Sequence, residues 1–147
     1  MLFLVHHGEA SALTVDPQRS LTNAGRITVK KLAVEAGIRG VKPDEIWHSG
    51  KVRARQTAQT FWKACNPLAS FSMVRGLQPS DPPEWIADRL AGETRNLMLV
   101  GHMPHLSALL TQLVSTAEPL IFPPHGLVAL EVHEHGWREV WRLDMNC

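Results

Sequence analysis

The chain has 147 residues, of which 44% are hydrophobic and 20% are charged, and 15 basic against 14 acidic residues leave a formal net charge of +1. This composition predicts a soluble globular protein and gives no electrostatic basis for a nucleic-acid or membrane partner. An anionic ligand must therefore be held by a local cluster of groups. The two cysteines, Cys65 and Cys147, are too few for a disulfide framework and are expected to be free thiols.

Hydrophobic periodicity and turn residues divide the chain into alternating strands and helices. In chain order we expect a strand over 2–5, a helix over 24–36, a strand over 45–48, a helix over 52–64, a strand over 71–74, a short helix over 83–90, a strand over 96–100, a helix over 104–114, and two strands over 127–132 and 137–143 joined by a tight turn. Thr22 is the expected N-cap of the first helix, and Ile27, Leu32 and Val34 are its expected apolar contacts.

This order of elements predicts an α/β fold. We expect three α/β/α layers around a mainly parallel sheet, with the antiparallel C-terminal hairpin at its edge. The absence of a repeat, linker or low-complexity stretch predicts a single domain over 1–147. The apolar run at the N-terminus is too short for a signal peptide and no stretch approaches a membrane span, so the cytoplasm is the expected compartment.

Polar groups follow three of the predicted strands at the point where each strand ends. His6, His7 and Gly8 follow the first strand, residues 49–55 follow the second, and His102 follows the strand over 96–100. Because ligands of an open parallel sheet bind at the carboxyl ends of its strands, we expect these groups to converge.

The chemistry of the converging groups is suited to phosphate. A neutral imidazole at His7 can attack phosphorus and carry the phosphoryl group, and the Gly8 carbonyl can fix its tautomer by accepting from the other ring nitrogen. Arg53 lies in the first turn of a helix and can bind phosphate oxygens in bidentate fashion. A protonated His102 would add another donor. The sequence therefore predicts a phosphate-handling site.

Four segments together resemble the histidine phosphatase superfamily, which is phosphoglycerate mutase-like in fold. The segment at His7 resembles the Arg-His-Gly signature, and the others resemble a Leu-Thr-x-x-Gly element, a Ser-spacer-Arg-Ala-x-Gln-Thr block and the block of the second essential histidine. These segments are Val5-His6-His7-Gly8-Glu9-Ala10, Arg19-Ser20-Leu21-Thr22-Asn23-Ala24-Gly25, Ser49-Gly50-Lys51-Val52-Arg53-Ala54-Arg55-Gln56-Thr57 and Leu99-Val100-Gly101-His102-Met103-Pro104.

The resemblance implies a role for each matching residue. His7 would be the phosphorylated nucleophile, and Arg53 and His102 would be catalytic groups that bind the phosphoryl oxygens, with His6 and Gly8 completing the phosphate-binding set. The short chain looks most like the SixA-type phosphohistidine phosphatases. The implied function is a metal-independent phosphatase without a cofactor, monomeric, that acts on a phosphorylated protein or a small phosphate ester.

His6 departs from the signature, which has arginine directly before the nucleophile. A histidine side chain is shorter than that of arginine, lacks the forked guanidinium and is only partly charged at pH 7. The loss of such an arginine is expected to cost about 2–4 kcal/mol, or roughly 30- to 1000-fold in rate. Arg19, Lys51 and Arg55 are candidates for compensation. The alternative function is a weakened or inactive module that binds phosphate or phosphoprotein.

Further polar residues are candidates for supporting roles. Asp81 is the candidate general acid, with Glu84 as a second choice. His48, His105 and His125 are candidates for lining the site, and His125 ranks first because the loop before the hairpin can fold over the pocket. His133 and His135 in the hairpin turn are interpreted as a solvated turn and not as a metal site.

Overall fold

The structure, a computed structural model, describes residues 1–134 and 136–145, so the predictions for His135 and Cys147 lie outside the described residues. Cys65 is a free thiol, as predicted, and its burial raises the pKa to about 11. Within the described ranges, no helix combines the length and the apolar character needed to cross a membrane.

The predicted elements are all present, and their ends lie within two residues of the expected ones. They are β1 (Leu2–His6), α1 (Asn23–Ile38), β2 (Glu45–His48), α2 (Val52–Cys65), β3 (Ser70–Met73), α3 (Glu84–Leu90), β4 (Leu97–Gly101), α4 (His105–Val114), β5 (Leu127–His133) and β6 (Gly136–Leu143). The side chain of Thr22 accepts a hydrogen bond from the Gly25 amide at 2.9 Å, which confirms the predicted cap of α1.

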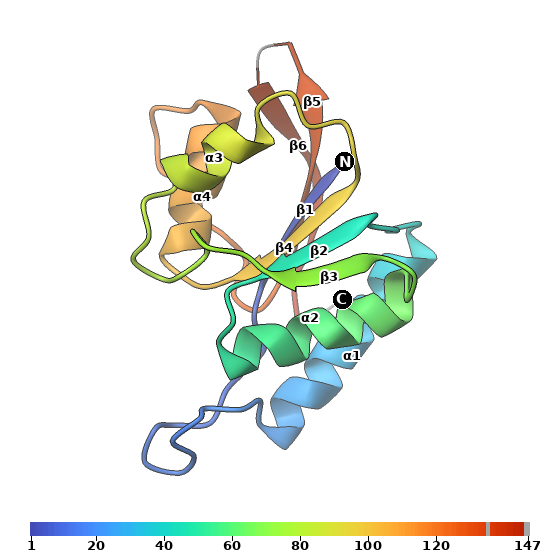
Figure 1. The fold of residues 1–147 in the computed structure, drawn as a ribbon, viewed down its shortest axis with the longest axis vertical. Coiled ribbons are helices and arrows are strands. Elements are labelled where there is room, and N and C mark those ends of the chain that lie inside the picture. The colour runs from blue at the N-terminus through green and yellow to red at the C-terminus, as the bar shows by residue number, and fades with distance from the viewer. Residues whose placement is uncertain (135, 146–147) are drawn as a thin grey trace.

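The six strands form one sheet in the order β3-β2-β4-β1-β5-β6. The first four strands in this order are parallel, whereas β5 is antiparallel to β1 and β6 is antiparallel to β5. The antiparallel hairpin therefore lies at one edge, as predicted. Figure 1 shows α1 and α2 below this sheet, with α3 and α4 on the other side.

Alternate residues of the central strands supply the two cores of the α/β/α sandwich. In β1, Phe3 and Val5 join the cluster that α1 and α2 cover, whereas Leu2 and Leu4 join the cluster that α3 and α4 cover. All of β1 and β4 is buried, because helices cover both faces of a parallel sheet. This confirms the predicted three-layer α/β/α architecture.

A topological switch point lies between β1 and β4. These neighbouring strands are parallel, and His6 of β1 is in register with Gly101 of β4. The helix that follows β1 covers one face of the sheet, whereas α4, which follows β4, covers the other. A crevice opens at the carboxyl ends of such a pair of strands, and ligands of α/β sheets bind there.

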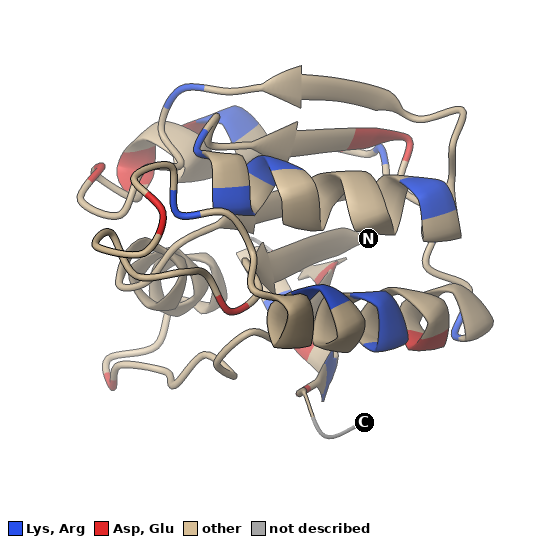
Figure 2. Ribbon diagram, turned by 90° about the horizontal axis from the view of Figure 1, so that it is seen from below, with Lys and Arg blue, Asp and Glu red and all other residues tan. Residues whose placement is uncertain are grey.

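Positive charge is concentrated on α1 and α2. Figure 2 shows Lys and Arg positions along these two neighbouring helices, whereas several of the Asp and Glu positions lie in loops. Helix α2 carries Arg53, Arg55 and Lys63 and no acidic residue. The nearly neutral chain thus has a locally basic element directly after β2.

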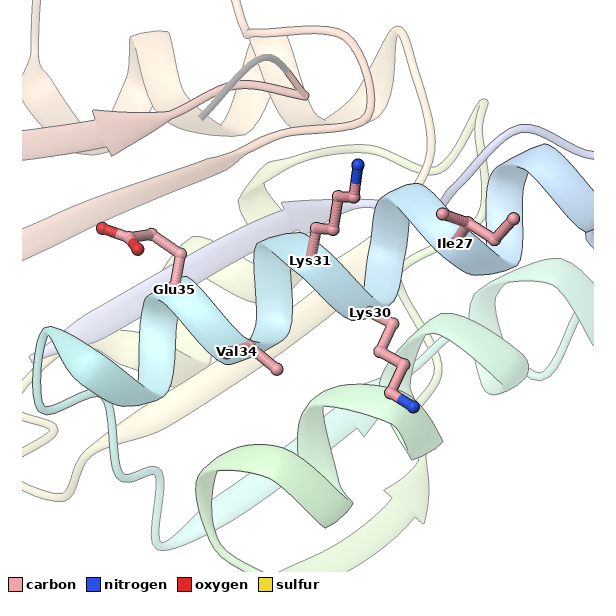
Figure 3. A pocket seen from close by; sticks show the side chains of 5 residues that line it. All are labelled: Ile27, Lys30, Lys31, Val34 and Glu35. Atoms are coloured by element: carbon pink, nitrogen blue, oxygen red, sulfur yellow. The ribbon is translucent and has the colours of Figure 1, made fainter.

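The expected apolar contacts of α1 are partly wrong. Leu32 is buried, but Ile27 is 59% and Val34 is 49% exposed, and the buried face instead includes Ala33 and Ala36. Helix α1 has two apolar stripes. Because α2 packs closely against α1, the stripe with the small residues Ala33 and Ala36 is the buried one. Ile27 and Val34, together with Lys30, Lys31 and Glu35, line an open hollow of about 450 Å³ on the outside of α1 (Figure 3).

Candidate active site

Three of the predicted groups meet at the carboxyl edge of the sheet. His7 follows β1, and its amide donates to the carbonyl of Gly101, the last residue of β4, at 3.1 Å. The ring centroids of His7 and His102 are 5.0 Å apart. Ser49, which follows β2, hydrogen-bonds to His102 with 2.6 Å between Oγ and Nε2. The expected convergence of the three sequence segments is confirmed.

The tautomer of His7 is determined by its neighbour. His7 Nδ1 lies 2.7 Å from the Gly8 carbonyl oxygen, which can only accept, so Nδ1 carries the proton and Nε2 holds a lone pair. This contact confirms the predicted role of the Gly8 carbonyl. Burial is the largest cause that lowers the pKa of His7, to about 4, with Arg53 and His125 adding to the effect. At neutral pH the ring is therefore uncharged.

Gly8 holds His7 in place through contacts on both sides of its peptide unit. Its amide donates to Thr57 Oγ1 at 3.0 Å, and the Thr57 hydroxyl donates to the Arg53 carbonyl at 2.8 Å. A Cβ at Gly8 would lie 2.4 Å from Cγ2 of Val29 on α1. Because both backbone groups of Gly8 are engaged within the protein, we assign it to positioning His7, whereas the sequence placed it among the phosphate-binding residues.

Arg53 brings a guanidinium to the same edge from the first turn of α2. Its Nε is buried and has no hydrogen-bond partner among the described residues. Its charge contributes to lowering the pKa of His6, His7 and His102, so it lies near all three. Burial and the nearby Arg19 lower the pKa of Arg53 itself. A buried donor of this kind is rarely left unpaired, and an anionic oxygen is its natural acceptor.

His102 is 1% exposed. Burial, followed by the repulsion of His7 and Arg53, lowers its pKa to about 3, so it is neutral in the free protein, and the expected protonation applies to the phosphate-bound site alone. When the Ser49 hydroxyl donates to Nε2, the ring proton is on Nδ1, a buried atom without a partner in the described chain. In that tautomer His102 offers an uncharged donor. Ser49 and Thr57 belong to the recognised segments, but the sequence assigned them no role.

His6 is also neutral. Burial, then His7, His125 and Arg53, lower its pKa to about 3. The backbone amide of His125 donates to His6 Nδ1 at 2.7 Å, and an amide can only donate, so the proton of His6 is on Nε2. His6 therefore presents one uncharged N–H at the position where the signature arginine has a charged guanidinium group.

His125 is the only one of the three further histidine candidates that the described contacts connect to His6 and His7. Its backbone has a φ of +55°, and its ring lies parallel to His6, with 10° between the planes and 4.6 Å between the centroids. His125 Nδ1 lies 2.6 Å from the His7 carbonyl oxygen. By contrast, the ring of His48 packs on Phe71. His105 is buried on α4, and neither ring nitrogen has a partner in the described chain.

The histidine cluster meets the distance condition for a metal site. One ring nitrogen from each of His6, His7 and His125 lies within 4.8 Å of those of the other two. The rings of His6 and His125 are stacked with 10° between their planes, so one ion cannot lie in the plane of both rings, as ligation by both imidazoles would favour. The proton on His6 Nε2 is a second obstacle to coordination. The arrangement thus favours hydrogen bonding over metal ligation.

The three cations proposed to compensate for the missing signature arginine act on different residues of the site. Arg19 acts on His7 and Arg53, and its Nε donates to the Ser11 carbonyl at 3.0 Å. Lys51 acts on His102. Arg55, which is exposed on α2, acts on His48 instead. Arg19 and Lys51 are therefore the cations that add to the charge of Arg53 at this edge.

Asp81 lies in the loop before α3 and not among the histidines of the cluster. Its carboxylate accepts from the Gln78 amide at 2.9 Å, and its charge acts on His105. Gln78 connects this loop to the site by donating to the Ser49 carbonyl at 2.7 Å. Ser49 and Asp81 also line a common hollow of about 340 Å³. The role of Asp81 as a general acid stays a prediction.

No protein-family profile matches the chain, and no curated protein sequence matches it. Solved structures do match. The protein histidine phosphatase SixA, complexed with tungstate, has a TM-score of 0.88 at 19% identity, covering 99% of this chain and 97% of that one. A putative phosphohistidine phosphatase SixA from Agrobacterium tumefaciens has a TM-score of 0.80 at 28% identity, covering 97% and 96%. A phosphoserine phosphatase from Entamoeba histolytica has a TM-score of 0.74 at 13% identity, covering 98% and 96%.

The chain therefore has the phosphoglycerate mutase-like fold of the histidine phosphatase superfamily. Within that superfamily, SixA-type proteins are among its structural neighbours and match it over nearly its whole length. This agrees with the resemblance that the four sequence segments carry.

Proposed function

We propose that the protein is a phosphatase that works through a phosphohistidine intermediate on His7. The observation that carries this proposal is the orientation of the His7 ring, with Nδ1 bonded to the Gly8 carbonyl and Nε2 free beside Arg53 and His102. A nucleophilic nitrogen with a fixed tautomer, next to buried donors that lack acceptors, is the arrangement that phosphoryl transfer requires.

The reaction has two displacement steps. The lone pair on His7 Nε2 attacks phosphorus, the bond from phosphorus to the leaving group breaks, and the leaving group takes a proton from water. Water then attacks the phosphorus on His7 and gives its proton to solvent, which releases inorganic phosphate and the neutral imidazole. Arg53 and the uncharged N–H of His102 stabilise the equatorial oxygens in both steps, because charge develops there in the transition state.

The proposed substrate is a phosphohistidine on a protein, with another phosphomonoester as the second choice. Support comes from the position of Asp81, which no described contact joins to His6, His7 or His102. The P–N bond of phosphohistidine has a good leaving group and needs little acid assistance, so it fits a site in which no described contact joins a carboxylate to these histidines. Three SixA-type neighbours carry phosphohistidine or histidine phosphatase in their names. We propose the same setting as the sequence does, a single-domain monomer in the cytoplasm.

A non-catalytic phosphate-binding module is the second candidate. The observation that favours it is the neutral His6, which replaces a charged fork by one uncharged donor. Such a site can hold a phosphorylated partner while it stabilises the transition state too weakly for turnover.

One assay separates the two candidates. Phosphate release from a phosphohistidine peptide and from phosphoramidate is followed for the wild type, His7→Ala and His6→Arg, with His133→Ala, on the exposed end of β5, as the control. Turnover in the wild type and the control, and none in His7→Ala, supports the phosphatase. No turnover in the wild type, with a gain in His6→Arg, supports the binding module. An acid-labile phosphoryl group on the wild type but not on His7→Ala would identify the intermediate.

A further inference from the structure

We propose that His125 is a phosphoryl-binding residue, and that the stacked His6–His125 pair replaces the signature arginine by binding an oxyanion together with one proton. The inference rests on the proposed function in one respect, since it places the oxyanion beside His7. It concerns how the anion is held and not whether turnover follows.

The first half of the pair is a donor whose direction the backbone determines. The amide of His125 donates to His6 Nδ1 at 2.7 Å, so the proton of neutral His6 is on Nε2. No hydrogen bond among the described residues engages that Nε2. His6 can therefore offer one N–H to an oxyanion without any change of protonation.

The second half of the pair has the opposite tautomer. His125 Nδ1 lies 2.6 Å from the His7 carbonyl oxygen, which can only accept, so Nδ1 carries the proton of the neutral ring. Its Nε2 then holds a lone pair, which would repel an anionic oxygen. His125 can donate from Nε2 only after that atom takes up a proton, and the ring becomes an imidazolium.

The stacking explains why the pair takes up one proton and not two. The rings are 10° from parallel with centroids 4.6 Å apart, so an imidazolium at His125 lies against the face of the His6 ring. A second positive charge on His6 would be repelled by the first, and His6 is already the more deeply buried ring.

The groups that face the pair make the proton uptake depend on an anion. The titratable groups that act electrostatically on His6 and His7 are His125, Arg53 and Arg19, all basic. An incoming dianion supplies the missing negative charge and favours the protonated form of His125. Binding of the anion and binding of the proton are therefore coupled, and each strengthens the other.

The substitution His125→Asn isolates the side chain from the backbone. Asparagine tolerates the φ of +55°, and its amide nitrogen can replace Nδ1 as a donor to the His7 carbonyl. The backbone amide that determines the His6 tautomer is kept. What the variant lacks is a ring nitrogen that can take up a proton.

Sulfate, which stays a monomeric dianion between pH 6 and 8.5, is the probe in isothermal titration calorimetry, because phosphate itself titrates in this range. Titrations in two buffers of different ionisation enthalpy count the protons taken up. We expect wild-type affinity to rise as the pH falls, with uptake of up to one proton. For His125→Asn we expect no uptake and affinity about tenfold weaker at pH 6 but close to the wild type at pH 8.5. His133→Asn is the matched control and should behave as the wild type.

Two results overturn the inference while the phosphatase proposal stands. One is sulfate binding without proton uptake that His125→Asn does not change. The other is a nitrogen-15 NMR spectrum in which His6 carries its proton on Nδ1. Tight binding of Zn²⁺ that requires His125 and displaces sulfate would instead reveal a metal site. Failure of the proposed function is distinct, since it appears as absent turnover in the wild type or as turnover that survives His7→Ala.

Discussion

The two sides of the site hold their polar atoms in different ways. On the β1 side, which comprises His6, His7 and His125, each Nδ1 is bonded to a backbone group. On the α2 side, which comprises Arg53 and His102, one buried nitrogen of each side chain has no partner in the described chain. The imidazoles of the β1 side are thus oriented in advance by the backbone, whereas the α2 side supplies the permanent charge and the free donors. Orientation of the proposed nucleophile and stabilisation of charge are therefore tasks of two separate groups of residues.

Removal of the charge on the α2 side should have the largest effect. We expect Arg53→Ala to lower kcat/KM for phosphoramidate about 10³-fold, near 4 kcal/mol, because the β1 side has no permanent charge to replace it. Arg53→Lys should recover only part of this loss, since an ammonium lacks the guanidinium fork. The exposed Arg55 is the matched control, and Arg55→Ala should change kcat/KM less than about threefold. Equal losses for Arg53→Ala and Arg55→Ala would remove the distinction between the two sides.

A substitution at Gly8, which positions His7 of the β1 side, should have the next largest effect. Gly8→Ala places a Cβ 2.4 Å from Val29 Cγ2, and such overpacking is expected to lower the free energy of unfolding by about 1–3 kcal/mol. Urea denaturation measures this loss. The double variant with Val29→Ala should be more stable than the sum of the two single changes predicts, by about 1 kcal/mol. Simple additivity would show that the clash is relieved elsewhere.

The neutral histidines should make stability depend on pH. The pKa of His6 and of His102 falls from 6.5 to about 3 in the folded protein, and that of His7 falls to about 4. Protons therefore bind the unfolded chain first as the pH falls. Above pH 6.5 these histidines are neutral in both states and do not lower the free energy of unfolding. Between pH 6.5 and about 3 the free energy of unfolding falls, because the unfolded chain binds protons that the fold does not.

Urea denaturation at pH 7 and pH 5 tests this expectation in a range where most carboxylates stay ionised. The free energy of unfolding should be lower at pH 5, and the difference should shrink in His6→Gln, which removes one titrating group. A pH-independent free energy of unfolding would mean that these histidines have the same pKa values in the folded and the unfolded chain.

The smallest expected effect concerns the single donor of His6. Glutamine keeps an uncharged N–H near the position of Nε2, so His6→Gln should stay within about threefold of the wild-type kcat/KM. His6→Ala removes the donor and should cost about 1 kcal/mol, or roughly fivefold. If glutamine and alanine are equally damaging, packing against His125 is what His6 contributes.

The fold and the meeting of the segments were predictable because they depend on local patterns and one topological rule. The apolar runs of β1 and β4 indicate strands covered on both faces, and residues just past such strands share one edge. The contact between His7 and the Gly8 carbonyl was predictable for the same reason, since it joins adjacent residues.

The rest depends on contacts between distant segments. The sequence shows two apolar stripes on α1, and only the approach of α2 excludes Ile27 and Val34 from the core. The neutral state of His102 results from burial beside His7 and Arg53, which no local pattern contains. The two hydrogen bonds of His125 join residues that are 118 and 119 positions apart. The sequence could place His125 near the pocket but could not predict which atoms it orients.

The position of β1 in the sheet has a consequence for protein synthesis. This strand is translated well before the two strands that flank it, β4 and β5. The amide of His7 finds its acceptor at Gly101, and the amide of His6 finds its acceptor at Gly126. Until those residues have left the ribosome, β1 is an apolar segment with two open edges, which is the kind of segment that chaperones protect from aggregation. His7, the proposed nucleophile, is therefore made well before the residues that determine its position.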